Sequence, residues 1–180
     1  MSFAKLLAEN SALANAVDLV GDKWSLMILS GCFSSVRRFN GFEKNLGINR
    51  NLLSARLDKL VKAGVLEKKL YQEKPARYEY IITEIGRELR PVLVALASWS
   101  EKHLVEGPSP VSIVHDHCDS KIEILLHCGS CERVLEQTEV ISRLNPDSGG
   151  KAERAHDETR GPVVNDLSGF YFLQFICKTF

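Results

Sequence analysis

Four side chains that bind metals well stand close together in the C-terminal half of the chain. They are His115, Cys118, Cys128 and Cys131. They form a His-x-x-Cys pair and, after nine residues, a Cys-x-x-Cys pair. Zinc takes four nitrogen and sulfur ligands in a tetrahedron, and ligands two residues apart supply them from tight turns. The pattern predicts a structural zinc site in a small ribbon, in which His117 or His127 could replace His115 and residues 121–126 form a strand.

The thiols of the second pair also permit redox chemistry. Cys128 and Cys131 could cycle between a dithiol and a disulfide, as many Cys-x-x-Cys pairs do. Such pairs usually stand at a helix start in a βαβ unit, which is not predicted around them. A third interpretation is that the cysteines stay reduced and bind nothing. Cys32 is expected in the core of the domain, and Cys177 stands alone near the C-terminus.

A second set of polar side chains, after residue 47, suits contact with nucleic acid. In residues 48–60 the leucines recur at helical spacing, so one face of this segment must pack inward. The opposite face carries hydrogen-bond donors. Arg50, Asn51 and Ser54 lie in the first turns, from which side chains reach base edges in a major groove. The pattern predicts base contacts by these three residues and a contact to the DNA backbone by Arg56.

The segments before residue 48 predict the helices that would position this face. Residues 13–20, 24–33 and 39–46 show helical apolar spacing. Asp22 can cap the second of these helices, Gly47 can end the third, and Asn49 can cap the helix that follows. Two helices joined by a few residues around a glycine are typical of a helix-turn-helix.

The segments after residue 64 predict a basic hairpin. Residues 65–71 and 77–83 are rich in β-branched and aromatic residues, and a polar loop containing Pro75 joins them. The helix predicted over residues 48–60 would enter the DNA groove and is called the recognition helix. In a winged helix-turn-helix, the basic hairpin that follows this helix is called the wing. Contacts to DNA phosphates are expected from cations on the wing, at a helix start and before the turn. These cations are Lys23, Arg37, Arg38, Lys74 and Arg77.

A last helix is predicted over residues 84–104, capped by Thr83 and kinked or broken at Pro91. Its apolar positions include Leu89, Leu93, Leu96 and Trp99. That face is wider than a domain of about ninety residues needs, so we expect a homodimer through this helix and the first one.

The distribution of charge, the length of the apolar runs and the number of cysteines narrow the class of protein further. Residues 1–107 hold 16 Lys and Arg against 12 Asp and Glu, and residues 108–180 hold 7 against 11. The basic half therefore coincides with the predicted wing and recognition helix. The chain has no apolar run long enough to span a bilayer and no secretory signal, so a cytoplasmic protein without a membrane partner is expected. Five cysteines in such a chain indicate thiols or a metal rather than a disulfide framework.

Three regions follow from these patterns. Residues 1–107 form a DNA-binding and dimerisation domain, and residues 108–143 form a small Cys/His-containing segment. Residues 144–180 form a polar linker and an apolar tail. The expected fold is mainly α with a small β-hairpin, a winged helix-turn-helix with a C-terminal appendage.

Over residues 13–104 the chain resembles the HxlR-type winged-helix transcription regulators, relatives of the MarR group. The resemblance is carried by Val-Gly-Asp-Lys-Trp-Ser from Val20, Arg-Phe-Asn-Gly-Phe from Arg38, and Leu-Leu-Ser-Ala-Arg-Leu from Leu52. Two further motifs are Gly-Val-Leu from Gly64 with Arg-Tyr-Glu-Tyr from Arg77, and Thr-Glu-Ile-Gly-Arg from Thr83. It implies a homodimeric, sequence-specific regulator of transcription that binds double-stranded DNA and is not an enzyme. Some members sense oxidants through a cysteine near the N-terminus, but the first cysteine here is Cys32.

Two other functions stay open at this point. One is a winged helix that contacts only proteins, and the other is a thiol-based redox protein using Cys128 and Cys131. Salt dependence separates the first from a DNA-binding protein, because binding to phosphates weakens steeply as salt rises. The operator sequence, the effector and the direction of regulation are not encoded in these patterns.

Overall fold

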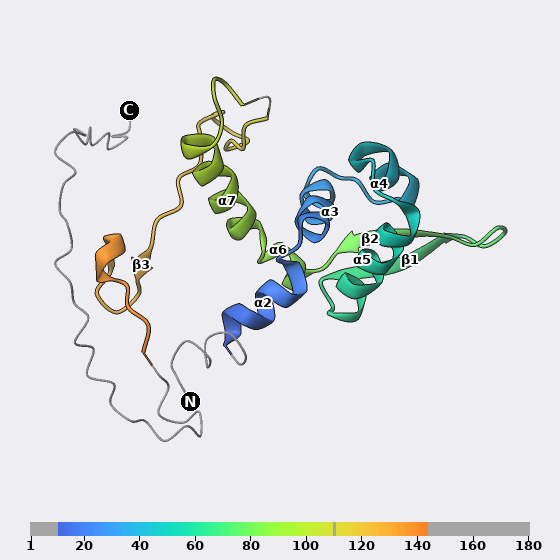
Figure 1. Ribbon diagram of the computed structural model, residues 1–180, viewed down its shortest axis with the longest axis horizontal. Helices are drawn as coiled ribbons and strands as arrows, with labels where there is room; N and C mark the ends of the chain where they lie inside the picture. The colour runs from blue at the N-terminus through green and yellow to red at the C-terminus, as the bar shows by residue number, and fades with distance from the viewer. Residues whose placement is uncertain (1–10, 110, 144–180) are drawn as a thin grey trace, which may run out of the picture. The chain divides into compact units, whose positions relative to one another are not determined.

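The computed structural model describes residues 11–109 and 111–143, so the predictions for residues 144–180 lie outside the described residues. Four helices come first (Figure 1): α2 (Ala12–Val20), α3 (Lys23–Phe33), α4 (Phe39–Leu46) and α5 (Arg50–Lys62). Local side chains begin three of them. Ser11, Asp22 and Asn49 each accept a hydrogen bond from a backbone N–H in the first turn. Gly47 ends α4 in the left-handed conformation, at φ 60°, which a glycine adopts without steric cost. The predicted helix-turn-helix is confirmed.

The wing is an antiparallel hairpin of β1 (Leu66–Gln72) and β2 (Arg77–Ile82). Its register runs from Leu66 opposite Ile82 to Gln72 opposite Arg77, with an irregularity near the turn. In Figure 1 the tip of this hairpin extends beyond α4 and α5. Arg38 forms an isolated bridge with Glu79, which joins the start of α4 to the hairpin.

The predicted last helix is broken, as expected from its proline. Thr83 caps the short α6 (Glu84–Arg87), and α7 (Arg90–His103) begins with Pro91 in its first turn. A proline fits there because the first N–H groups of a helix have no partner within it.

One core lies beneath these elements. Its side chains without solvent exposure come mainly from α3, α4 and α5, with strand β1 closing one side. They are Ile28, Leu29, Phe42, Leu53, Leu57 and Leu60. Because the three leucines of α5 all point into this core, the opposite face of α5 is turned outward. The architecture is a winged helix-turn-helix, mainly α with one small hairpin.

The segment after α7 contains little regular structure. Val114 pairs with Lys121 in an isolated bridge, and β3 (His127–Cys128) pairs with β4 (Arg133–Val134). The strand predicted over residues 121–126 is wrong, because only Lys121 of that range pairs with another backbone segment in the described residues. The described residues up to Val134 belong to one compact unit, and those from Leu135, with the short helix η1 (Gln137–Glu139), belong to another. None of the described helices is long and apolar enough to cross a membrane.

Candidate nucleic-acid interface and cysteine turns

The outward face of α5 presents the predicted base-contacting side chains. Asn51 and Ser54 are exposed, whereas Leu53 and Leu57, on the opposite side, have no exposed surface. In the part of the chain that the structure describes, no hydrogen bond or ion pair engages the side chains of Asn51 and Ser54. Their donors and acceptors are therefore available to an external partner.

Arg50, the third predicted base contact, has an internal partner. Its Nη1 donates to Glu43 Oε2 of α4 at 2.7 Å, and its guanidinium lies 5.1 Å from the centre of the Phe39 ring. The side chain remains 66% exposed. An exposed ion pair of this kind is worth little, so Arg50 can exchange Glu43 for another acceptor at small cost.

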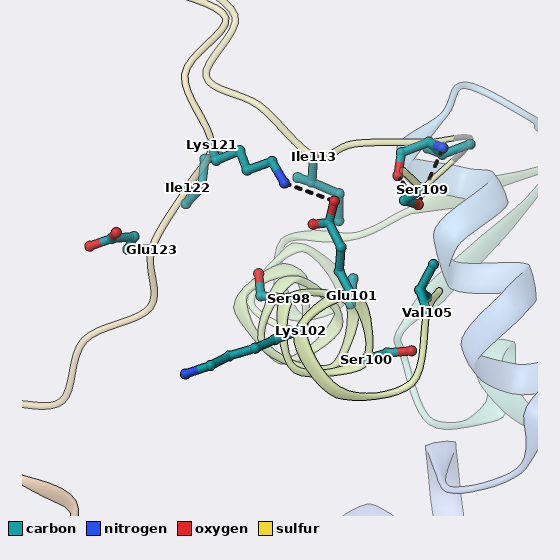
Figure 2. A pocket seen from close by; sticks show the side chains of 12 residues that line it. Ser98, Ser100, Glu101, Lys102, Val105, Ser109, Ile113, Lys121, Ile122 and Glu123 are labelled. Atoms are coloured by element: carbon teal, nitrogen blue, oxygen red, sulfur yellow. Dashed lines mark hydrogen bonds and ion pairs between the residues drawn. The ribbon is translucent and has the colours of Figure 1, made fainter. Parts of the chain in front are cut away.

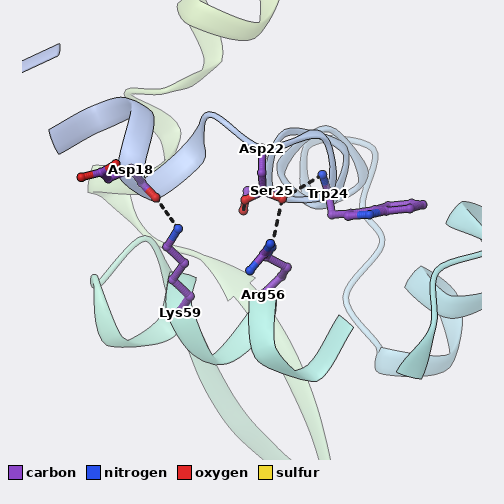
Figure 3. A network of polar contacts seen from close by, with 6 residues as sticks. All are labelled: Asp18, Asp22, Trp24, Ser25, Arg56 and Lys59. Carbon is purple, nitrogen blue, oxygen red and sulfur yellow. Dashed lines mark hydrogen bonds and ion pairs between the residues drawn. The ribbon is translucent and has the colours of Figure 1, made fainter. Parts of the chain in front are cut away.

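Arg56 points to the cap of α3 instead of outward (Figure 3). Its Nε donates to Asp22 Oδ1 at 2.9 Å. The same carboxylate caps α3 by accepting the backbone N–H groups of Trp24 and Ser25, and the Ser25 hydroxyl donates to its other oxygen at 2.6 Å. Arg56 therefore joins α5 to α3, which departs from its predicted contact with the DNA backbone. Lys59 makes a second contact from α5, this one to α2, by donating to the Asp18 carbonyl.

This network also lowers the pKa of Asp22. Burial opposes ionisation, but hydrogen bonds from the Ser25 hydroxyl and N–H, followed by the contact with Arg56, outweigh it. The pKa of the carboxyl therefore lies below its ordinary value, and Asp22 is charged at neutral pH.

The predicted phosphate contacts fall into two groups. Lys74 and Arg77 are exposed at the hairpin turn, and Arg37 is exposed before α4. The other two have internal neighbours. Arg38 donates to Glu79 Oε1 at 2.9 Å and lies over Tyr71, and Lys23 lies 4.8 Å from the centre of the Trp24 ring.

Helices α2 and α7 each expose apolar side chains. Leu89 and Leu93, two of the residues predicted for the dimer face, instead pack against the core. Leu96 and Trp99 remain 50% and 56% exposed. On α2, Leu13 and Val17 are 70% and 55% exposed. Val92, in the first turn of α7, is also 45% exposed, so exposed apolar side chains run along this helix from Val92 to Trp99.

The four predicted metal ligands form two separate pairs. His115 Nδ1 lies 3.2 Å from Cys118 Sγ. Hydrogen bonds from the Ser120 hydroxyl, from His115 and from the Ser120 N–H lower the pKa of Cys118 to about 7. In the second pair, hydrogen bonds from the backbone N–H groups of Cys131 and Ser130 and from the Cys131 thiol lower the pKa of Cys128. In residues 11–109 and 111–143, the structure brings no three His, Cys, Asp or Glu side chains into one metal-binding group.

Cys32 behaves as predicted for a core thiol. It is partly buried and packs against the core, and burial raises its pKa to about 12. It is therefore protonated and unreactive at neutral pH.

Sequence patterns missed the acidic partners of the interface arginines. Glu43 and Glu79 hold Arg50 and Arg38. Glu43 and Arg50 lie close in sequence, on the two helices that the turn at Gly47 connects, and this could have indicated the first pair. The second joins residues 41 positions apart, and local spacing carries no signal for it.

Comparison with known proteins agrees with the winged helix-turn-helix architecture described above. The model of the HxlR-like helix-turn-helix family matches residues 19–107. The HTH-type transcriptional regulators Mb3122 of Mycobacterium bovis and Rv3095 of Mycobacterium tuberculosis, both uncharacterised, are each 37% identical over 149 residues, covering 82% of this chain and 92% of theirs.

Two solved structures are also similar. PA1607, described as a candidate transcription factor, superposes with a TM-score of 0.67 at 30% identity, covering 79% of this chain and 99% of its own. PA1374 of Pseudomonas aeruginosa, described in the same way, has a TM-score of 0.57 at 28% identity and covers 76% of this chain and 94% of its own.

Proposed function

We propose that this chain, which belongs to the HxlR-like helix-turn-helix family of transcriptional regulators, binds specific sequences of double-stranded DNA as a homodimer. Members of this family are regulators, not enzymes. The observation that carries the proposal is the outward face of α5, where Asn51 and Ser54 stand exposed and without internal partners in the described structure.

Base readout is assigned to the first two turns of α5. An asparagine amide matches the donor and acceptor that adenine presents in the major groove, and arginine matches guanine. Arg50 would exchange Glu43 for a base, and Asn51 and Ser54 need no exchange. Replacing Asn51 with Ala should weaken binding to a selected operator by about 1–3 kcal/mol and leave binding to unrelated duplex unchanged.

Fluorescence anisotropy with both duplexes tests this assignment. Asn15→Ala provides the matched control, because Asn15 is also an exposed asparagine in a helix, but it lies on α2. Equal affinity of the Asn51→Ala variant and the parent for the operator would remove Asn51 from the base contacts.

Contacts to the DNA backbone are assigned to the exposed cations, with Lys74 and Arg77 of the wing as the main pair. Each lost phosphate contact lowers the slope of log affinity against log salt by about one. The double Ala variant should therefore lose about two from this slope on every sequence, while Lys102→Ala on α7 should lose nothing. An unchanged slope in the double variant would take the wing out of the interface, and a parent that binds no duplex at all would favour a protein-interaction module.

The homodimer is assigned to the apolar surfaces of α2 and α7. Leu96 and Trp99 expose about half of their side chains, which is unfavourable unless a second surface covers them. Leu96→Glu should convert the dimer to a monomer in light scattering while its circular dichroism is unchanged. Leu70→Glu on the wing is the matched control, since Leu70 is 45% exposed. A monomeric parent at micromolar concentration would contradict the assignment.

A further inference from the structure

The two donor pairs after α7 are built in the same way, although they are separated in sequence. The first pair lies in a turn closed by the bridge between Val114 and Lys121. Within it, the His115 N–H donates to the Ser120 carbonyl at 2.9 Å, and the Asp119 N–H donates to the His115 carbonyl at 2.8 Å. The second pair lies in a turn closed by β3 and β4, with Cys128 opposite Arg133. Each pair therefore stands at the end of its own small hairpin.

In the first turn the two donors already lie side by side, with His115 Nδ1 3.2 Å from Cys118 Sγ. In the second turn Cys128 ends β3, and Cys131 lies in the turn that follows it. The two cysteines are separated by two residues, which is the usual spacing of a zinc-binding thiolate pair.

Both turns also share an uncommon backbone conformation at the same position. Asp119 follows the second donor of the first pair and has φ 55°, and Glu132 follows the second donor of the other pair and has φ 51°. Residues other than glycine rarely adopt this left-handed conformation, because the Cβ atom approaches the carbonyl oxygen. This conformation follows directly after Cys118 in the first turn and directly after Cys131 in the second.

We propose that His115, Cys118, Cys128 and Cys131 together bind one Zn²⁺ ion per chain, and that this ion is structural. One nitrogen and three sulfur donors are a set that zinc prefers, and four protein ligands leave no position for a reactive water. Binding requires the connection of residues 119–127 to fold back so that the second pair meets the first. The entropic cost of closing a loop this short is small compared with the free energy of zinc binding.

The surroundings of the two turns explain why an ion is needed. Ile124, Leu125 and Leu126, in the connection between the turns, are 43%, 62% and 48% exposed, and no residue from Val111 to Val134 is fully buried. A segment with so few buried side chains requires a bound metal ion or a covalent cross-link to adopt one stable structure. The first turn has one anchor on the domain (Figure 2), where Lys121 Nζ lies 2.8 Å from Glu101 Oε1 of α7.

His115 is selected over the other nearby histidines by its position. Its Nδ1 lies beside Cys118 Sγ, whereas the His117 ring only meets the His115 ring edge to face, with 6.2 Å between their centres. His127 lies in β3, opposite Val134. His117→Ala therefore provides a matched control for His115→Ala.

The test is metal analysis of the full-length protein purified without chelator, combined with native mass spectrometry. One zinc per chain is expected in the parent and in the His117→Ala and Cys32→Ser variants. Cys118→Ser and Cys128→Ser should each lower the zinc content at least tenfold, and His115→Ala should weaken zinc retention against a competing chelator. Circular dichroism and DNA binding of each variant show that the winged helix remains folded.

Two results would overturn the proposal. One is a parent that takes up no zinc when it is reduced and supplied with excess metal. Another is zinc that stays bound after Cys128→Ser. In the first case, a Cys128–Cys131 disulfide in protein purified under air would assign the second pair to redox chemistry.

Discussion

Replacing Arg56 with Gln tests whether this residue acts within the protein or on DNA. Its ion pair with Asp22 has a separation of 2.9 Å, and both side chains are only 30% exposed. A hydrogen bond between charged groups contributes about 1.5–3 kcal/mol when it is shielded, and an exposed ion pair contributes below about 1 kcal/mol. For this half-shielded pair we expect the free energy of unfolding to fall by about 1–2 kcal/mol.

Two assays on the same variant separate the alternatives. Urea unfolding measures the loss of stability, and the salt dependence of DNA binding counts phosphate contacts. Arg56→Gln should lower stability and leave the salt slope unchanged. Arg87→Gln is the control, because its ion pair with Glu84 has the same separation but 55% and 82% exposure, so its loss should be small. A slope reduced by about one with unchanged stability would show that Arg56 binds a phosphate and would refute the internal assignment.

Three further changes test the packing and the cap. Leu57→Ala removes a side chain without exposed surface and should lower the free energy of unfolding by about 2–5 kcal/mol in urea titration. Gly86→Ala should lower the free energy of unfolding more than Gly47→Ala does in the same titration, because a Cβ at Gly86 would overlap the Val65 carbonyl. Gly47 faces open space, so its replacement should lower the free energy of unfolding by only about 1–2 kcal/mol, through strain in its left-handed backbone. Equal losses for the two variants would contradict this. Asp22 contributes stability above its unfolded-state pKa, and this contribution is lost as pH falls through its lowered folded-state pKa. Asp22→Asn should therefore reduce stability at pH 7 and make unfolding less dependent on pH in the acid range, as followed by circular dichroism.

The helix boundaries could be predicted because their causes are local. Asp22, Asn49 and Thr83 each accept a backbone N–H two or three residues further on, and Pro91 breaks the last helix through its own ring. These interactions need no knowledge of the tertiary structure. The inward face of α5 was predictable for a similar reason, since its leucines recur at helical spacing.

The directions of the interface arginines could not be predicted in the same way. Arg50 and Arg56 lie on one helix, but one reaches Glu43 and the other reaches Asp22, 34 residues away. Which acceptor a long side chain finds depends on how α3, α4 and α5 pack together. The strand expected over residues 121–126 was wrong for a related reason, because an apolar run becomes a strand only when another strand pairs with it.

The turns after α7 illustrate a further limit. Residue types suggest the donor pairs, but a glycine would ordinarily mark the left-handed positions that Asp119 and Glu132 occupy. The backbone conformation that makes the two turns alike is therefore visible only in the structure.

Selection of bound fragments from random duplex DNA by the purified protein tests the central claim most directly. Two copies of α5 related by two-fold symmetry should enrich an inverted repeat whose half-sites are centred about 34–36 Å apart, one turn of the double helix. The Asn51→Ala variant should lose part of this preference at one position of each half-site. Enrichment of no sequence, or of a single half-site bound by one chain, would contradict a homodimeric, sequence-specific regulator.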